Sequence, residues 1–216
     1  MGLDSKTPFP LDRIYEMAEY PNYEPDPARD SIAARAALAG EEPLAYAYDV
    51  MMRNDGGGMI HVPLANYTAG HFDEVRKILS HPGTRVSLAD GGAHLTRVAD
   101  AATPTFMLMH WARDRSRGEK LPLEFVIRSL TLDTASSYGL NDRGRIAPGF
   151  LADINVIDFD NLRLPAPYRM FDLSAGGQRL LQRAEDIVAT IKSGVIIFRD
   201  GEHLGNFPGR LVRAGS

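Results

Sequence analysis

A carboxylate, two glycines and a histidine lie close together in the stretch RVSLADGGAHL, residues 85–95. Asp90 follows a short apolar run, residues 86–89, that has the composition of a buried strand. Gly91 and Gly92 carry no side chains, so a ligand or metal ion can approach the backbone there. A carboxylate in this place could contact a metal ion or accept a proton from water. Asp-Gly alone is also a common turn dipeptide, and the rest of the chain must decide between the two interpretations.

The elements before Asp90 predict how it is positioned. Residues 58–67 contain a strand that runs into a loop, and residues 70–84 contain a helix with one apolar face. A second apolar strand then leads to Asp90. This order predicts a right-handed βαβ unit with parallel strands, which are buried on both faces. In a (β/α)8 barrel, the chemistry lies at the C-terminal ends of such strands. The apolar residues on the predicted helical face are Phe72, Val75, Ile78 and Leu79.

Helices are predicted elsewhere in the first part of the chain and around residues 103–140. Residues 10–20 have helical spacing. Asp30 or Ser31 can cap a helix that ends at Gly40, and Pro43 fits the first turn of the next helix, which a run of glycines ends. The predicted fold class is therefore α/β.

From Gly144 onward the pattern changes to alternating apolar and polar residues. The stretch EDIVATIKSGVIIFRDGE, residues 185–202, predicts two strands joined by a Ser-Gly turn. These strands and the one near residue 154 predict a small antiparallel sheet. A domain boundary is expected near Leu140.

Composition excludes several classes of function. The 216 residues carry a net charge of −4, which disfavours nucleic acid as the main partner. The chain has no cysteine, so it forms no disulfide and has no thiolate nucleophile. No apolar run approaches the roughly 20 residues that span a bilayer, and no signal segment is recognised. No membrane association and a cytoplasmic location are expected.

Five phrases in the same order resemble the C-terminal part of the amidohydrolase superfamily, most closely its N-acyl-D-amino-acid deacylase (D-aminoacylase) branch. The resemblance implies a metal-dependent (β/α)8 barrel, usually with zinc, and a β-sandwich. Residues 1–140 would be the C-terminal part of the barrel, with its terminal βα units, and residues 141–216 would supply sandwich strands. The phrases are SLADGGAH, LTLDTASSYGL, GRIAPGFLADINVID, ATIKSGVIIFRDGE and PGRLVR.

The resemblance also assigns roles to two residues. Asp90 matches the aspartate that contacts the metal in the family and takes a proton from the attacking water. His94 is a candidate for the active site as a substrate contact or a supporting residue, not as a metal ligand. The family's H-x-H metal motif does not occur in this sequence, and the other five histidines do not match its ligand positions. Zinc is therefore expected to bind this chain alone weakly or not at all.

The function implied is hydrolysis of the amide bond in N-acyl-D-amino acids, with the chain inactive by itself. A cyclic-amide hydrolase of the hydantoinase or dihydropyrimidinase type is an alternative, and so is a non-catalytic remnant that acts as a binding or assembly subunit. Unpaired strand edges predict self-association or pairing with a second polypeptide that carries the H-x-H half.

Overall fold

The computed structural model describes residues 9–86 and 94–212, so Asp90 lies outside the described residues. The chain divides into two compact units, Met1–Lys77 (unit 1) and Ile78–Ser216 (unit 2). The division near residue 140 into barrel part and sandwich strands stays a prediction.

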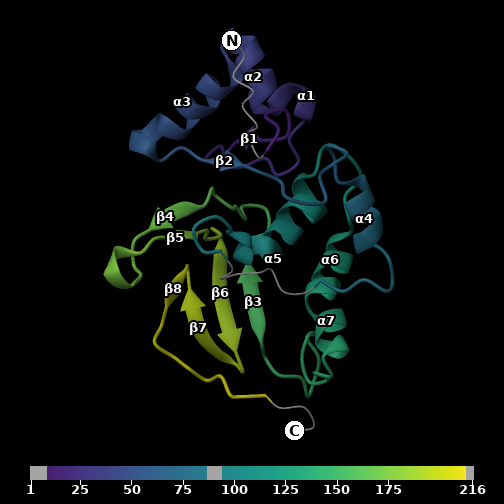
Figure 1. The fold of residues 1–216 in the computed structure, drawn as a ribbon. Coiled ribbons are helices and arrows are strands. Elements are labelled where there is room, and N and C mark those ends of the chain that lie inside the picture. The colour runs from purple at the N-terminus through teal and green to yellow at the C-terminus, as the bar shows by residue number, and fades with distance from the viewer. Residues whose placement is uncertain (1–8, 87–93, 213–216) are drawn as a thin grey trace. The chain divides into compact units, whose positions relative to one another are not determined.

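Unit 1 contains short helices and one pair of very short strands (Figure 1). Its elements are β1 (Tyr15–Glu16), α1 (Pro27–Asp30), α2 (Ile32–Ala39), α3 (Pro43–Gly56), β2 (Ile60–His61) and the start of α4 (Asp73–Leu79).

The predicted caps of α2 and the predicted place of Pro43 in the first turn of α3 are confirmed. The Ser31 hydroxyl accepts a hydrogen bond from the N–H of Ala34, and Gly40 ends α2 with φ of 72°. A glycine is favoured there because this left-handed conformation is costly for other residues. Pro43 is the first residue of α3, where its missing N–H costs nothing.

The predicted helix over residues 10–20 is wrong. Tyr15 and Glu16 form strand β1, which pairs antiparallel with His61 and Ile60. The N–H of Ile32 also donates to the carbonyl of Ile14 at 2.9 Å. Pairing partners far away in the sequence thus satisfy this backbone, and the local helical spacing does not decide its conformation.

The predicted parallel βαβ unit is not found among the described strands, all of whose pairings are antiparallel. The strand expected at residues 58–67 is present as β2, but it pairs with β1. The second strand of the predicted unit falls largely on residues 87–90, outside the described residues. The described strands form no barrel, and the fold that they establish is a mixed α/β one.

The core of unit 1 lies between β1 and helices α2 and α3. Ile14, Ile32, Ala47 and Val50 form a buried cluster, and Ile32 is fully buried. Burying a side chain of this size contributes about 1.5–3 kcal/mol relative to leaving it in water. This cluster explains why the strand residues at 14–16 are held against the helices.

Unit 2 begins with a helical region that corresponds to the helical hairpin expected after residue 103. Its segments are η1 (Asp100–Ala102), α5 (Thr103–Phe106), the π-helical η2 (Met107–Asp114), α6 (Leu123–Leu130) and α7 (Leu132–Ser137). Trp111 and Val126 are buried where η2 packs on α6. The N–H of Leu121 donates to the carbonyl of Trp111 and fixes the connection between the two helices.

A four-stranded antiparallel sheet follows, in the order β3-β6-β7-β8 (Figure 1). The predicted strands near residue 154 and on both sides of the Ser-Gly turn are confirmed. Ser193 and Gly194 have φ of 51° and 82°, as a tight hairpin turn requires. A separate hairpin, β4–β5, was not predicted. The strands are β3 (Ile154–Ile157), β4 (Tyr168–Met170), β5 (Arg179–Leu181), β6 (Ile187–Lys192), β7 (Val195–Arg199) and β8 (Glu202–His203), with the short helix η3 (Ser174–Gly176) between β4 and β5.

Candidate active site

The segment that carries Asp90 is anchored at both of its described ends. On one side, the Thr134 hydroxyl of α7 donates to the carbonyl of Val86 at 2.8 Å. On the other side, the N–H of Leu180 in β5 donates to the carbonyl of Leu95 at 2.7 Å. Helix α7 and hairpin β4–β5 therefore hold the chain before and after the predicted catalytic loop. The role of Asp90 itself stays a prediction, because this residue is not described.

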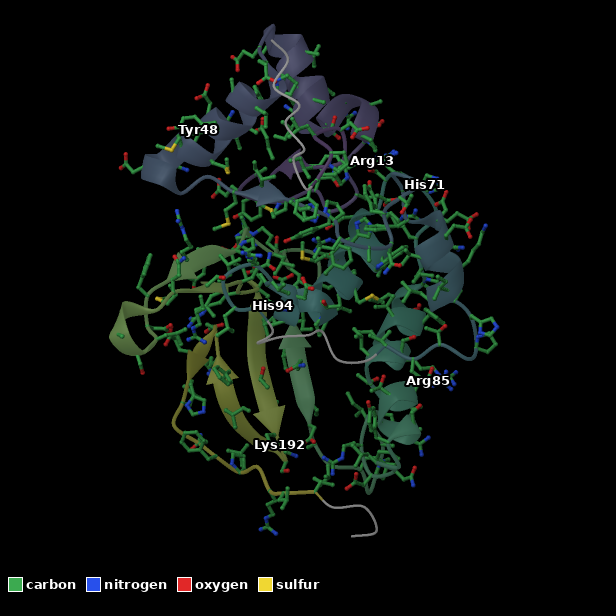
Figure 2. The ribbon with its side chains drawn as sticks, viewed as in Figure 1. Arg13, Tyr48, His71, Arg85, His94 and Lys192 are labelled. Carbon is green, nitrogen blue, oxygen red and sulfur yellow. The ribbon has the colours of Figure 1, made fainter. Side chains whose placement is uncertain are left out.

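His94 begins a tight turn at the end of this loop. Its carbonyl accepts hydrogen bonds from the N–H groups of Arg97 and Val98, and its φ is 45°. Its side chain is exposed, and within the described residues no hydrogen bond engages the imidazole. Figure 2 shows His94 well away from the Lys192 end of the sheet. An exposed ring can reach a ligand, which is what the predicted substrate contact requires.

Two of the other histidines are partly buried among aromatic rings. His61 lies 5.6 Å from the Tyr23 ring and 6.3 Å from the Tyr15 ring. Burial lowers the pKa of His61 to about 4, because a charged imidazole loses its hydration there. His110 stacks on Phe106 with ring centroids 4.8 Å apart. These contacts describe packing residues, as expected for histidines outside the family's ligand positions.

The remaining three histidines accept hydrogen bonds from nearby backbone groups. Nδ1 of His71, His81 and His203 accepts the N–H of the residue two positions later in each case. His71 also lies 3.3 Å from the Asp73 carboxylate. These local bonds organise turns and helix starts. These hydrogen bonds do not bring the three imidazoles together.

A zinc site needs three or four protein ligands. Within residues 9–86 and 94–212, no three His, Asp or Glu side chains are grouped so that they could hold a metal ion. The described residues therefore do not fit a zinc site by themselves, and no chemical step through a metal is derived from them.

The phrase GRIAPGFLAD ends in Asp153, and its role in the structure is to fix a turn. Both carboxylate oxygens of Asp153 lie 2.8 Å from Lys192 Nζ, and Oδ1 also accepts the N–H of Ser193 at 2.9 Å. Burial tends to raise the pKa of Asp153. Its hydrogen bonds to Lys192 and Ser193, with the charges of Lys192 and Arg143, outweigh burial and lower that pKa. Asp153 thus ties the loop before β3 to the β6–β7 turn.

Two further arrangements were not foreseen from the sequence. Arg113 in η2 donates to the carbonyls of Phe159, Asp160 and Leu162, which joins the helical region to the loop after β3. Arg115 is buried, with its guanidinium 5.0 Å from the Trp111 ring centroid. Buried arginines are rare unless they are paired or bonded. In the sequence, however, Arg113 and Arg115 belong to a short basic run, which predicts a solvated helix end.

The described residues form a mixed α/β protein, and comparison with known families identifies its class. The sequence profile described as "Amidohydrolase family" matches residues 18–198, which is most of the chain. The chain therefore belongs to the amidohydrolase family.

A relative supports a narrower similarity. The chain is 27% identical over 167 residues to the D-aminoacylase of Alcaligenes xylosoxydans xylosoxydans. The alignment covers 76% of this chain and 31% of that enzyme, so the chain spans about a third of its relative's length. No solved structure matches the chain. In the part of the chain that the structure describes, none of the helices has the length and apolar character needed to cross a membrane.

Proposed function

We propose that this chain is the C-terminal portion of a metal-dependent hydrolase that cleaves the amide bond of N-acyl-D-amino acids. The observation that carries the proposal is the family match over residues 18–198 together with the similarity to a D-aminoacylase. The proposal includes a (β/α)8 barrel and a β-sandwich in the complete enzyme, to which this chain contributes its terminal parts. It also includes a cytoplasmic location.

In this proposal the Asp90 carboxylate accepts a proton from the attacking water and returns it to the leaving amine. A zinc ion in the complete enzyme would lower the pKa of that water. Its histidine ligands would have to come from residues other than those described. His94, at the end of the same loop, would contact the substrate.

The proposed partner is a polypeptide that carries the H-x-H half of the enzyme. The described sheet supports it, because it exposes apolar side chains that water disfavours: Val156, Val188, Val195 and Phe198 are each about 40% exposed. If the partner is absent, the same surface is expected to promote self-association.

The test combines an activity assay with a measurement of association. The chain is purified alone and together with a co-expressed polypeptide that carries the H-x-H motif, and each sample is assayed on an N-acetyl-D-amino acid and its L-isomer with added zinc. We expect no turnover by the chain alone and D-selective deacylation by the complex. Size-exclusion chromatography with light scattering would show the two chains co-eluting.

Asp90→Asn is the diagnostic variant, and Asp200→Asn is the matched control at an exposed turn. Asp90→Asn should leave the complex assembled and lower turnover by several powers of ten, because it removes the proton acceptor. Full activity of Asp90→Asn would contradict the assigned role. A complex that forms but hydrolyses only cyclic amides would favour the hydantoinase alternative, and a stable complex with neither activity would favour the non-catalytic subunit.

A further inference from the structure

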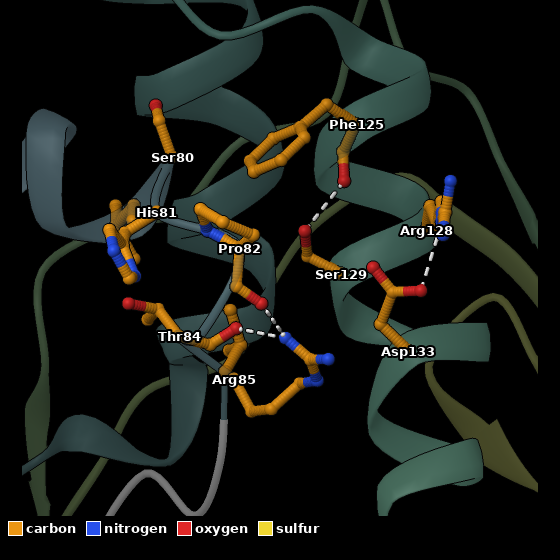
Figure 3. A pocket seen from close by; sticks show the side chains of 11 residues that line it. Ser80, His81, Pro82, Thr84, Arg85, Phe125, Arg128, Ser129 and Asp133 are labelled. Atoms are coloured by element: carbon orange, nitrogen blue, oxygen red, sulfur yellow. Dashed lines mark hydrogen bonds and ion pairs between the residues drawn. The ribbon is translucent and has the colours of Figure 1, made fainter.

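Unit 2 contains a surface hollow with a volume of about 270 Å³ between the loop after α4 and helices α6 and α7 (Figure 3). Pockets for drug-sized ligands usually measure about 300–1,000 Å³, so this one suits a smaller molecule. Its charged lining consists of Arg85, Arg128 and Asp133. None of these residues has a role in the proposed hydrolysis.

In the part of the chain that the structure describes, neutral groups hold Arg85 in place. Its Nη1 donates to the carbonyls of Pro82 and Thr84, both at 2.7 Å, and its Nε donates to the Ser137 hydroxyl at 3.0 Å. These bonds use the N–H groups of Nη1 and Nε and leave the two N–H groups of Nη2 available as single donors. Within the described residues, no carboxylate forms an ion pair with Arg85. The described residues therefore fix its positive charge in position without neutralising it.

Arg128 faces the same hollow from α6. Its Nε lies 2.9 Å from Oδ1 of Asp133, which uses one edge of this guanidinium and leaves its terminal donors available. Asp133 supplies one negative charge against the two arginines, so the charged lining has a net charge of +1 at neutral pH. Figure 3 shows the Arg85 side chain reaching across the hollow toward the helices that carry Ser129 and Asp133.

We propose that this hollow binds a small oxyanion, a phosphate or a carboxylate, between the guanidinium groups of Arg85 and Arg128. The Nη1 and Nη2 end of Arg128 presents parallel N–H donors that match the oxygens of both anions, and Nη2 of Arg85 adds a single donor. Arg85 is already ordered by its bonds to Pro82, Thr84 and Ser137, so little side-chain entropy is lost when the anion binds. The proposal does not depend on the amidohydrolase activity.

The experiment is a titration of the full chain with inorganic phosphate, in which isothermal calorimetry or NMR measures binding. Ionic strength is held constant with chloride, because 24 Lys and Arg residues attract anions non-specifically. We expect saturable binding that Arg85→Gln weakens about tenfold, the size expected when a charge-assisted hydrogen bond is lost. Arg128→Gln should also weaken it. A parallel titration with acetate distinguishes a preference for phosphate from one for carboxylates.

Arg199→Gln is the matched control, since it removes an exposed positive charge from β7 in the same unit, outside the hollow. It should change phosphate affinity less than twofold. Arg85→Lys keeps the charge but loses the guanidinium that Pro82, Thr84 and Ser137 hold in place, so it should bind more weakly than the unmodified chain. Trp111 fluorescence checks folding, and if Arg85→Gln fails to fold, Arg85→Lys and Arg128→Gln decide. Equal weakening by Arg128→Gln and Arg199→Gln, or no saturable binding, would overturn the proposal.

Discussion

Replacing Asp153 with asparagine should destabilise unit 2, because this carboxylate holds the β6–β7 turn through both a side chain and the backbone. A hydrogen bond to a charged group is typically worth about 1.5–3 kcal/mol, but exposed ion pairs are worth 1 kcal/mol or less. The side chains of Asp153 and Lys192 are 25% and 28% exposed, so the pair lies between these limits. Asparagine can still accept the N–H of Ser193. We therefore expect Asp153→Asn to cost about 1 kcal/mol and Asp153→Ala, which loses both interactions, about 2 kcal/mol.

Urea unfolding followed by Trp111 fluorescence measures the stability of unit 2, which also contains Asp153. Trp111 is the single tryptophan of the chain, and it is buried in unit 2. Asp200→Asn is the control, since it makes the same change of charge at an exposed turn where asparagine tolerates the φ of 47°. If Asp153→Asn unfolds at the same urea concentration as Asp200→Asn, the reasoning about the turn is refuted.

The dependence of this effect on pH follows from the lowered pKa of Asp153. A carboxyl whose pKa is lower in the folded state stabilises the fold above its unfolded pKa of about 3.9. That stabilisation is lost as the pH falls through the folded pKa. The difference in stability between the unmodified chain and Asp153→Asn should therefore be largest near neutral pH and shrink in acid. A difference that stays constant down to pH 2 would show that the charge of Asp153 contributes nothing.

Two further predictions concern unit 1. His61 should titrate near pH 4 in NMR spectra. Unit 1 should lose stability as the pH falls from about 6.5 toward 4, because the unfolded chain binds a proton at His61 more readily than the folded chain does. A His61 pKa near 6.5 would contradict its burial. Gly70→Ala should destabilise unit 1 more than Gly40→Ala, measured by hydrogen exchange of α2 and α3. Both glycines have φ of 72°, but a Cβ at Gly70 would lie 2.6 Å from Pro27 Cγ, whereas one at Gly40 meets no atom within 4 Å. Equal losses of protection would show that Pro27 moves aside without cost.

Turns and helix ends could be predicted because their causes are local. Ser31 and Gly40 bound α2 through one side-chain hydrogen bond and one left-handed residue, and the Ser193–Gly194 turn follows from the conformations that these two residues adopt readily. Family membership could also be inferred, since the order of the five phrases is a property of the sequence itself. The roles of Asp90 and His94 rest on that same resemblance and stay predictions.

Tertiary structure decided what depends on partners distant in the sequence. Residues 10–20 have helical spacing, yet Tyr15 and Glu16 form a strand because residues 60 and 61 supply their pairing partners. Hairpin β4–β5 was missed because its strands are only three residues long and carry little periodic signal. In the sequence, Asp153 is recognisable only as the last residue of the phrase GRIAPGFLAD. The fold is what places it against Lys192, 39 residues later. Arg85 and Arg128 are distant in the sequence, and only the folded chain brings them to the same hollow.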